Sequence, residues 1–335
     1  MNVSIIYVNY KTAALVIDSI RSVQEHTTGI SYEILVVDNG SADGSAERIR
    51  QACPEATLIE AGENLGFGRA NNLGAEHASG ETIFFLNPDT RLLNNAVRIL
   101  YNYLMSDKKA GACGGNLVDA EGQPACSFGR SFPSFWQEFL SIFYLEPVYR
   151  RHSHSTSYNY TGRPLAVASL VGADLLVKRA VLEKTGGFSP DFFMYFEETE
   201  LCRRIRKAGY RIVSVPDARI VHLEGQAPHI TASRMQRFFE GQYVFFSKRY
   251  GSWGPAALYG LLTLKCAVRA WQFMLLGYAD RLAYWRTKGA ANRQVYRSYR
   301  ENNAPAKRKK KAAPEAPAVA LPSGPNKRPE KTPEK

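Results

Sequence analysis

Residues 82–89 read Thr82-Ile83-Phe84-Phe85-Leu86-Asn87-Pro88-Asp89, an apolar run that stops at a carboxylate. An unbroken run with β-branched and aromatic members is typical of a strand buried on both faces, and Pro88 cannot extend a strand. Asp89 is therefore predicted at the carboxyl end of a strand, where open parallel α/β sheets bind their ligands. A carboxylate there is a candidate ligand for a hard cation and its phosphates. The alternative is an ordinary turn in which Asn87 and Asp89 cap the chain.

The same alternation of strand and helix precedes this run. Strand patterns cover Val3–Val8, Glu33–Asp38 and Thr57–Ile59, and helical patterns follow each of them. Asp38 also ends a buried run, so it is a second carboxylate at the same predicted edge. The glycines of Asn64–Asn72 would let backbone N–H groups approach an anion at the start of a helix. This order predicts an α/β fold with a parallel sheet and right-handed crossovers.

A later helix carries the clearest local inference about chemistry. If it starts near Tyr195, Glu198 shares one side with three apolar residues at i+3, i+4 and i+7, and Glu197 and Glu200 lie on the polar side. A carboxylate on the inward side of a first turn either caps the helix or faces a site. Burial would raise its pKa towards that of a useful base.

Two further regions have open interpretations. His222 ends the last strand-like segment and is either a metal ligand or a structural histidine. Residues 124–164 are rich in aromatic, Ser, Arg and His residues without clean periodicity. Such a segment is expected to be a long functional loop or a chain lying on the surface.

The C-terminal third differs in composition from the rest of the chain. Residues 253–284 are strongly apolar but interrupted by charges, so no run reaches the ~18 to 20 residues of a spanning helix. We expect one or two helices in a membrane interface, with a domain-packing helix pair as the alternative. Residues 304–335 hold nine Lys/Arg against three Glu, half of the formal net charge of +12. This tail is predicted to be disordered and to bind anionic lipid, because no nucleic-acid recognition module accompanies it.

The cysteines and the N-terminus bear on the compartment. Five Cys residues without a Cys-x-x-Cys pair favour a reducing compartment over a disulfide or zinc framework. The segment Met1–Tyr7 has neither a basic leader nor a long apolar core, so it is expected to be a strand and not a secretory signal. The predicted location is cytoplasmic.

Five motifs in order resemble family 2 glycosyltransferases of the GT-A fold, and in particular bacterial rhamnosyltransferases that build cell-surface polysaccharide. The motifs are Ile5–Tyr10, Val36–Ser45, Asn64–Gly68, Leu86–Asp89, and Gly186–Phe188 taken with Phe196–Glu198. The resemblance covers about residues 1–230.

The resemblance implies a mixed, mostly parallel Rossmann-like sheet flanked by helices, with a C-terminal helical extension. The expected organisation is a nucleotide-sugar-binding catalytic domain over 1–230, a helical membrane-interface extension over 231–300 and a disordered basic tail over 301–335. The implied reaction is the inverting transfer of a sugar, L-rhamnose from dTDP-rhamnose as the best single choice, to a lipid-linked or polysaccharide acceptor. A UDP-hexose or UDP-galactose donor is the alternative. The enzyme is expected to be peripheral on the inner face of the cell membrane.

The resemblance also assigns site residues. Asp89 resembles the last residue of the family's Asp-x-Asp metal motif, and His222 the histidine that completes a site for Mg²⁺ or Mn²⁺. Asn87 replaces the first acid of that motif and is not expected to bind the metal directly. The residues expected to bind the donor are Asn9, Tyr10, Asp38, Asn64, Gly66, Phe67, Asn71, Asn87 and Asp89.

One departure from the family pattern concerns the base. The family commonly shows Phe-Glu-Asp-x-Asp-Leu, whereas this chain has Phe196-Glu197-Glu198-Thr199-Glu200-Leu201. Glu198 matches the acidic residue that serves as the catalytic base in the family, and Glu197 stays as the alternative base. A sugar-nucleotide pyrophosphorylase is disfavoured because Asn9–Thr12 stands where its glycine-rich loop would be. A non-catalytic nucleotide-sugar-binding membrane scaffold is the other rival.

Overall fold

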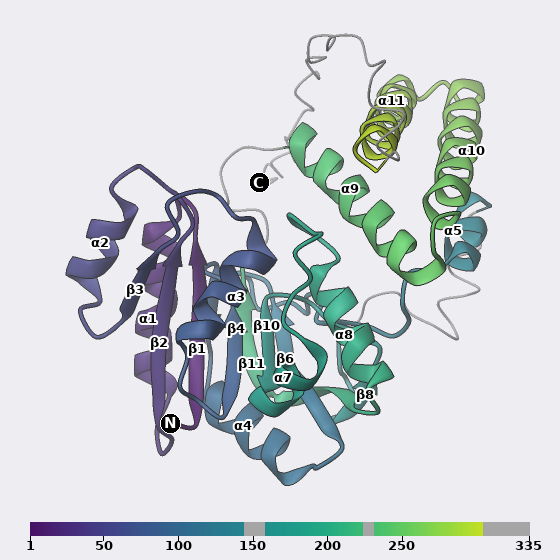
Figure 1. Ribbon diagram of the computed structural model, residues 1–335. Coiled ribbons are helices and arrows are strands. Elements are labelled where there is room, and N and C mark those ends of the chain that lie inside the picture. The colour runs from purple at the N-terminus through teal and green to yellow at the C-terminus, as the bar shows by residue number, and fades with distance from the viewer. Residues whose placement is uncertain (144–157, 224–230, 304–335) are drawn as a thin grey trace, which may run out of the picture.

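A computed structural model describes residues 1–143, 158–223 and 231–303 (Figure 1). Within these residues a nine-stranded sheet has the order β3-β2-β1-β4-β10-β6-β11-β5, and β8 pairs with β11. Its strands are β1 (Val3–Asn9), β2 (Tyr32–Asp38), β3 (Thr57–Glu60), β4 (Thr82–Leu86), β5 (Thr90–Leu92), β6 (Ala110–Val118), β8 (Leu165–Val167), β10 (Asp174–Lys178) and β11 (Arg211–His222).

The sheet is mixed, which confirms the mixed sheet that the resemblance implied. Strands β1 to β4 pair in parallel as predicted, and β6 pairs in parallel with β11. Strand β10 lies antiparallel between β4 and β6, while β5 and β8 run antiparallel to β11. Strand β5 follows β4 after only three residues, too few for the helical crossover that parallel strands need. Strand β9 (Ser169–Leu170), which precedes β10, lies outside this sheet.

Helices cover both faces of this sheet because alternate strand residues point to opposite sides. Ile5 of β1 packs with α1, α2 and α4, whereas its neighbour Ile6 shares a second core with α7 and α8. Helix α3 packs on Val8 and Val37. The helices are α1 (Ala13–His26), α2 (Ser45–Ala52), α3 (Phe67–His77), α4 (Ala96–Ser106), α7 (Arg179–Thr185) and α8 (Glu197–Lys207).

The segment expected to be a long loop contains regular structure. Helix α5 (Phe135–Ile142) starts with a capping box in which Ser134 and Gln137 exchange hydrogen bonds, and β7 (Phe128–Gly129) pairs with β9. Ser-x-x-Gln before an apolar run is a helix-start signal, and it does not depend on a clean hydrophobic period. Residues 144–157 lie outside the described residues.

Three long helices form the C-terminal region: α9 (Thr231–Tyr250), α10 (Gly254–Leu275) and α11 (Ala279–Asn302). Figure 1 shows them as a layer beside the sheet domain, with α5 alongside α10. Their shared core includes Tyr243, Phe246, Leu258 and Val295. No helix in the described part of the chain is long and apolar enough to cross a membrane. The basic tail of 304–335 falls outside the described residues.

Candidate active site

The carboxyl ends of β1 and β2 hold a buried polar network. Asn9 and Asp38 are register partners at the last positions of the two strands. The Asn9 amide donates to Asp38 Oδ1 at 2.6 Å and to Ser41 Oγ at 3.1 Å. The backbone N–H of Ser41 donates to Asp38 Oδ2 at 3.1 Å. This network fixes the Asp38 carboxyl at the ligand-binding edge, where the sequence predicted it.

The glycine loop is tied to this network through Asn39 and Asn64. The Asn39 amide donates to Asn64 Oδ1 at 3.1 Å, and Asn39 Oδ1 accepts from the Leu65 N–H at 2.8 Å. Gly66 has φ +81°, and a Cβ there would lie 2.4 Å from the Phe193 carbonyl oxygen. Gly66 is thus required both by its left-handed backbone and by the close approach of the 193 loop.

The remaining predicted donor residues lie around this loop. Tyr10 is exposed at 42%, with Lys11 Nζ 5.5 Å from its ring centroid. Phe67 starts α3, and its N–H donates to the Phe193 carbonyl at 2.9 Å. Asn71 is buried, and its amide donates back to the Phe67 carbonyl at 3.1 Å. Tyr10 is therefore partly accessible to a ligand, whereas the Asn71 amide group donates within its own helix.

Asp89 and His222 come together from two elements far apart in sequence. His222 is the register partner of Thr90 in the β5–β11 pair, and the Leu223 N–H donates to the Asp89 carbonyl at 2.9 Å. His222 Nε2 and Asp89 Oδ1 are 3.4 Å apart, and both side chains are largely buried. The described residues contain no group of three or more His, Cys, Asp or Glu that could hold a metal ion. Asp89 and His222 therefore form a two-residue donor set, to which phosphate oxygens and water would have to be added.

Asn87 adds an unsatisfied polar atom at this edge. Its N–H donates to the Ala173 carbonyl at 2.9 Å, and its carbonyl accepts from the Thr90 hydroxyl at 2.6 Å. Its side-chain Oδ1 is buried and has no hydrogen-bond partner among the described residues. Because buried polar atoms in folded proteins are nearly always paired, this oxygen is a candidate ligand contact.

The two candidate bases occupy different environments in the first turn of α8. Glu197 is buried beside Gly68, and its Oε2 has no hydrogen-bond partner within the described residues. Burial and the neighbouring Glu198 raise the pKa of Glu197 well above its usual value. Glu198 is half-buried against Gly172, and the Thr199 hydroxyl donates to its Oε1 at 3.0 Å. Burial raises the pKa of Glu198 too.

The polar side of α8 is not solvent-facing as the periodicity suggested. Glu197 and Glu200 are buried, and Glu198 is the more accessible of the first two acids. The expectation failed because α8 starts at Glu197 and its second side is covered by α3 and the 186–196 loop. Tyr195 and Phe196 both have φ +71°, a strained backbone that sets this start.

Glu198 and the Asn87–Asp89 turn are linked through one short segment. Gly172 lies against the Glu198 side chain, with its would-be Cβ 3.5 Å from Cγ, and the next residue, Ala173, accepts the Asn87 hydrogen bond. The strands place both groups at one edge of the sheet. Glu198 and the Asn87–Asp89 turn therefore both lie next to the 172–173 segment at this edge of the sheet.

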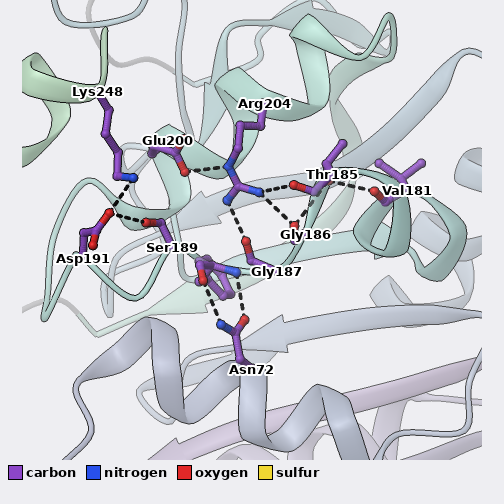
Figure 2. Close-up of polar contacts among 11 residues, drawn as sticks. Asn72, Val181, Thr185, Gly186, Gly187, Ser189, Asp191, Glu200, Arg204 and Lys248 are labelled. Carbon is purple, nitrogen blue, oxygen red and sulfur yellow. Dashed lines mark hydrogen bonds and ion pairs between the residues drawn. The ribbon is translucent and has the colours of Figure 1, made fainter. Parts of the chain in front are cut away.

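Arg204 holds the 186–196 loop in place, as Figure 2 shows. Its guanidinium donates to Glu200 Oε2 at 2.8 Å and to the carbonyls of Thr185, Gly186 and Gly187 at 2.5, 3.0 and 2.6 Å. Arg204 lies four residues after Glu200, on the side of the helix that was expected to be polar. Its role could have been suspected from Gly186-Gly187, because exposed carbonyls past a helix end need donors.

Replacing Arg204 by Ala is expected to lower the free energy of unfolding by about 2–4 kcal/mol, because Glu200 and three carbonyls lose their donor. Thermal unfolding monitored by circular dichroism would measure it. Lys207→Ala, which removes an exposed cation of the same helix, is the matched control and should change stability by less than about 0.5 kcal/mol. Equal stability of the two variants would contradict the role given to Arg204.

Residues 4–186 match glycosyl transferase family 2. The chain belongs to this family. The glycosyltransferase is 30% identical over 254 residues to the N-acetylglucosaminyl-diphospho-decaprenol L-rhamnosyltransferase of Mycobacterium tuberculosis, covering 71% of this chain and 81% of the relative. It is 26% identical to rhamnosyltransferase WbbL of Escherichia coli over 203 residues, covering 57% of this chain and 72% of WbbL.

A solved structure supports the fold of the glycosyltransferase. The mannosyltransferase PcManGT of Pyrobaculum calidifontis, solved with GDP-Man and Mn²⁺, superposes with a TM-score of 0.56 at 20% identity. The match covers 89% of this chain and 86% of PcManGT. The GT-A fold and the resemblance to rhamnosyltransferases predicted from the sequence are thus confirmed.

Proposed function

We propose that this glycosyltransferase transfers a sugar with inversion from a nucleotide-sugar donor, with dTDP-L-rhamnose as the favoured donor, to a lipid-linked or polysaccharide acceptor. The observation that carries the proposal is the Asp89–His222 pair, together with half-buried Glu198 against Gly172, next to the residue that accepts the Asn87 hydrogen bond. The curated relatives are named as rhamnosyltransferases, and one name gives a diphospho-decaprenol acceptor. These names support the donor and the acceptor class.

In the proposed reaction Glu198 acts as the base. Its carboxylate takes the proton of the acceptor hydroxyl as that oxygen forms a bond to the anomeric carbon. The bond from the anomeric carbon to the diphosphate oxygen breaks on the opposite face, and the nucleoside diphosphate leaves with the electron pair. Glu198 is favoured over Glu197 because Glu197 is buried against Gly68, away from solvent.

The donor is held by the other residues of the site. Asp38, fixed by Asn9, and the exposed ring of Tyr10 would hold the base of the nucleotide, and the loop from Asn64 the ribose and sugar. Asp89 and His222 would hold Mg²⁺ or Mn²⁺, and the ion when bound would neutralise charge on the departing diphosphate. The fit rests on their 3.4 Å separation and on the unpartnered side-chain oxygen of Asn87, two residues before Asp89. The Mn²⁺ in the structure of PcManGT supports a divalent ion here.

Calorimetric binding and donor hydrolysis test the proposal. The full chain is titrated with dTDP-L-rhamnose, UDP-galactose, UDP-glucose and GDP-mannose, with and without Mn²⁺. We expect Mn²⁺-dependent binding of dTDP-L-rhamnose at least about tenfold tighter than the other donors, which corresponds to about 1.4 kcal/mol. Tighter binding of a UDP-hexose would still support a glycosyltransferase but would overturn the assignment of dTDP-L-rhamnose as the donor. Binding of a donor without any hydrolysis would favour the non-catalytic scaffold, and absence of binding by all four donors would overturn the proposal.

We also propose that the enzyme works as a peripheral protein on the inner face of the cell membrane, where a lipid-linked acceptor would be presented. The lack of a spanning helix in the described residues is compatible with a peripheral location.

A further inference from the structure

Helix α10 presents an apolar face to solvent. Its exposed residues are two alanines, one glycine, and Leu264, Trp271, Met274 and Leu275. The four large side chains are between 48% and 63% exposed. A helix of 22 residues extends over about 33 Å, so this face is long as well as apolar. Soluble helices normally show the opposite arrangement, with polar residues outward.

The two charged residues of α10 point into the protein. Lys265 Nζ lies 3.4 Å from Glu138 Oε2 of α5, and both side chains are 18% exposed. Arg269 is buried, and its guanidinium donates to the Ser141 carbonyl of α5 at 2.7 Å. The inward side of α10 therefore binds the domain through ion pairs and hydrogen bonds. Its outward side carries no charge.

Helix α5 repeats the arrangement next to α10. Trp136, Phe139 and Phe143 are exposed at 58%, 40% and 52%, while Glu138 faces inward. Their spacing of three and four residues puts them on one side of the helix. Their rings contact each other in sequence, with centroids 5.8 and 5.4 Å apart. In Figure 1 α5 lies alongside α10.

The apolar face is followed in the chain by a basic helix. Leu276 and Tyr278, in the turn after α10, are about 60% exposed. The exposed residues of α11 then include five arginines and only two acids. The arginines are Arg281, Arg286, Arg293, Arg297 and Arg300. Aromatic and aliphatic side chains beside a basic surface match the chemistry of an anionic bilayer interface.

We propose that the exposed faces of α5 and α10, defined by Trp136, Phe139, Phe143, Leu264, Trp271 and Leu275, dock the enzyme on an anionic lipid bilayer. This docking face deepens the proposed peripheral location and rests on it. It resolves the alternatives for residues 253–284: the helices pack on the domain through their inward side and keep an apolar outward side for lipid.

A second copy of the chain is a poorer occupant of this face. A two-fold dimer through α5 and α10 would join two copies that each carry a formal net charge of +12, because such an interface repeats the same surface. Like charges brought together oppose association. Anionic lipid instead complements the arginines, and the basic residues of 304–335 add to the same attraction.

The test is flotation of the full chain with vesicles of phosphatidylethanolamine and phosphatidylglycerol, and with vesicles of phosphatidylcholine alone. The double variant Trp271→Gln/Leu275→Gln removes two exposed side chains of the docking face. The matched control Leu93→Gln/Met105→Gln removes two side chains that are 43% and 40% exposed on the sheet domain. We expect the docking-face variant to lower partitioning into the anionic vesicles by at least about tenfold, and the control by less than about twofold.

Three outcomes would overturn the proposal: no flotation of the wild type with anionic vesicles, equal flotation of both double variants, or a dimer in light scattering that only the docking-face variant dissociates. Calorimetric donor binding without vesicles is measured on the same proteins. It should be unchanged in the docking-face variant, since neither residue contacts the site. If the protein failed to bind vesicles but still bound the donor, the membrane docking would be overturned and the proposed transferase would not. If the wild type failed to bind the donor, the proposed transferase would be overturned and the docking would not.

Discussion

Glu198→Gln is expected to lower kcat by about 10²- to 10⁴-fold while KM for the donor changes little, because it removes only the group that accepts the proton. Gln keeps the size of Glu and can still accept the Thr199 hydroxyl hydrogen bond seen at 3.0 Å. Initial rates at saturating donor, with a soluble analogue of the acceptor, would measure the loss. Unchanged circular dichroism would exclude unfolding as its cause.

The pH profile gives an independent test of the same residue. Burial raises the pKa of Glu198, and the base works only when ionised. We therefore expect kcat of the wild type to fall as the pH drops through a value above the ~4.3 of an ordinary Glu. This acid limb should vanish from the residual activity of Glu198→Gln.

Glu197→Gln is the matched control, because it makes the same change one residue away. Its side chain is buried beside Gly68, with a pKa raised further by the charge of Glu198. We expect this variant to keep kcat within about tenfold of the wild type. If it instead abolished activity while Glu198→Gln did not, the base would be Glu197.

Asp89→Ala is expected to remove the effect of Mn²⁺ on donor binding and to lower kcat/KM by at least about 10²-fold, since charge on the leaving diphosphate would be less well neutralised. The local backbone conformation should not change, because the Leu223 N–H donates to the backbone carbonyl of Asp89 and not to its side chain. Calorimetry with and without Mn²⁺ gives a readout that does not depend on turnover.

The control for this prediction is Asp217→Ala, which removes an exposed aspartate of β11, the strand that carries His222. It should leave Mn²⁺-dependent binding unchanged. His222→Ala should reproduce the Asp89 variant in part, because Nε2 lies 3.4 Å from Oδ1. If donor binding by Asp89→Ala depended on Mn²⁺ as strongly as in the wild type, the assignment of Asp89 and His222 as metal ligands would be wrong.

Much of the sheet domain was predictable because its signals are local. The apolar run that ends at Asp38 is β2, and the run before Asp89 is β4. The glycine-rich segment leads into the start of α3. The antiparallel insertion of β10 was not predictable from alternation, because a single strand's pattern does not give its direction. Helix α5 was overlooked although Ser134 and Gln137 form its capping box.

The candidate site shows the same division. The residue types and their order along the chain, with carboxylates and a histidine at strand and helix ends, follow from the sequence. The sequence did not show which acid of α8 is accessible, because the burial of Glu197 depends on its packing against Gly68 of another helix. The hydrogen bonds from Arg204 to the loop carbonyls were equally unpredictable, since those carbonyls lie 17 to 19 residues earlier in the chain.

The sequence alone determined the fold class, the family and the apolar character of α10, because each depends on residue type and spacing. The direction of the Lys265 and Arg269 side chains was decided by packing against α5, and that left the apolar side of α10 outward. Likewise, Asp89 and His222 became neighbours through the pairing of β5 with β11. Contacts between distant segments set burial and accessibility, and neither is encoded in the local pattern of residues.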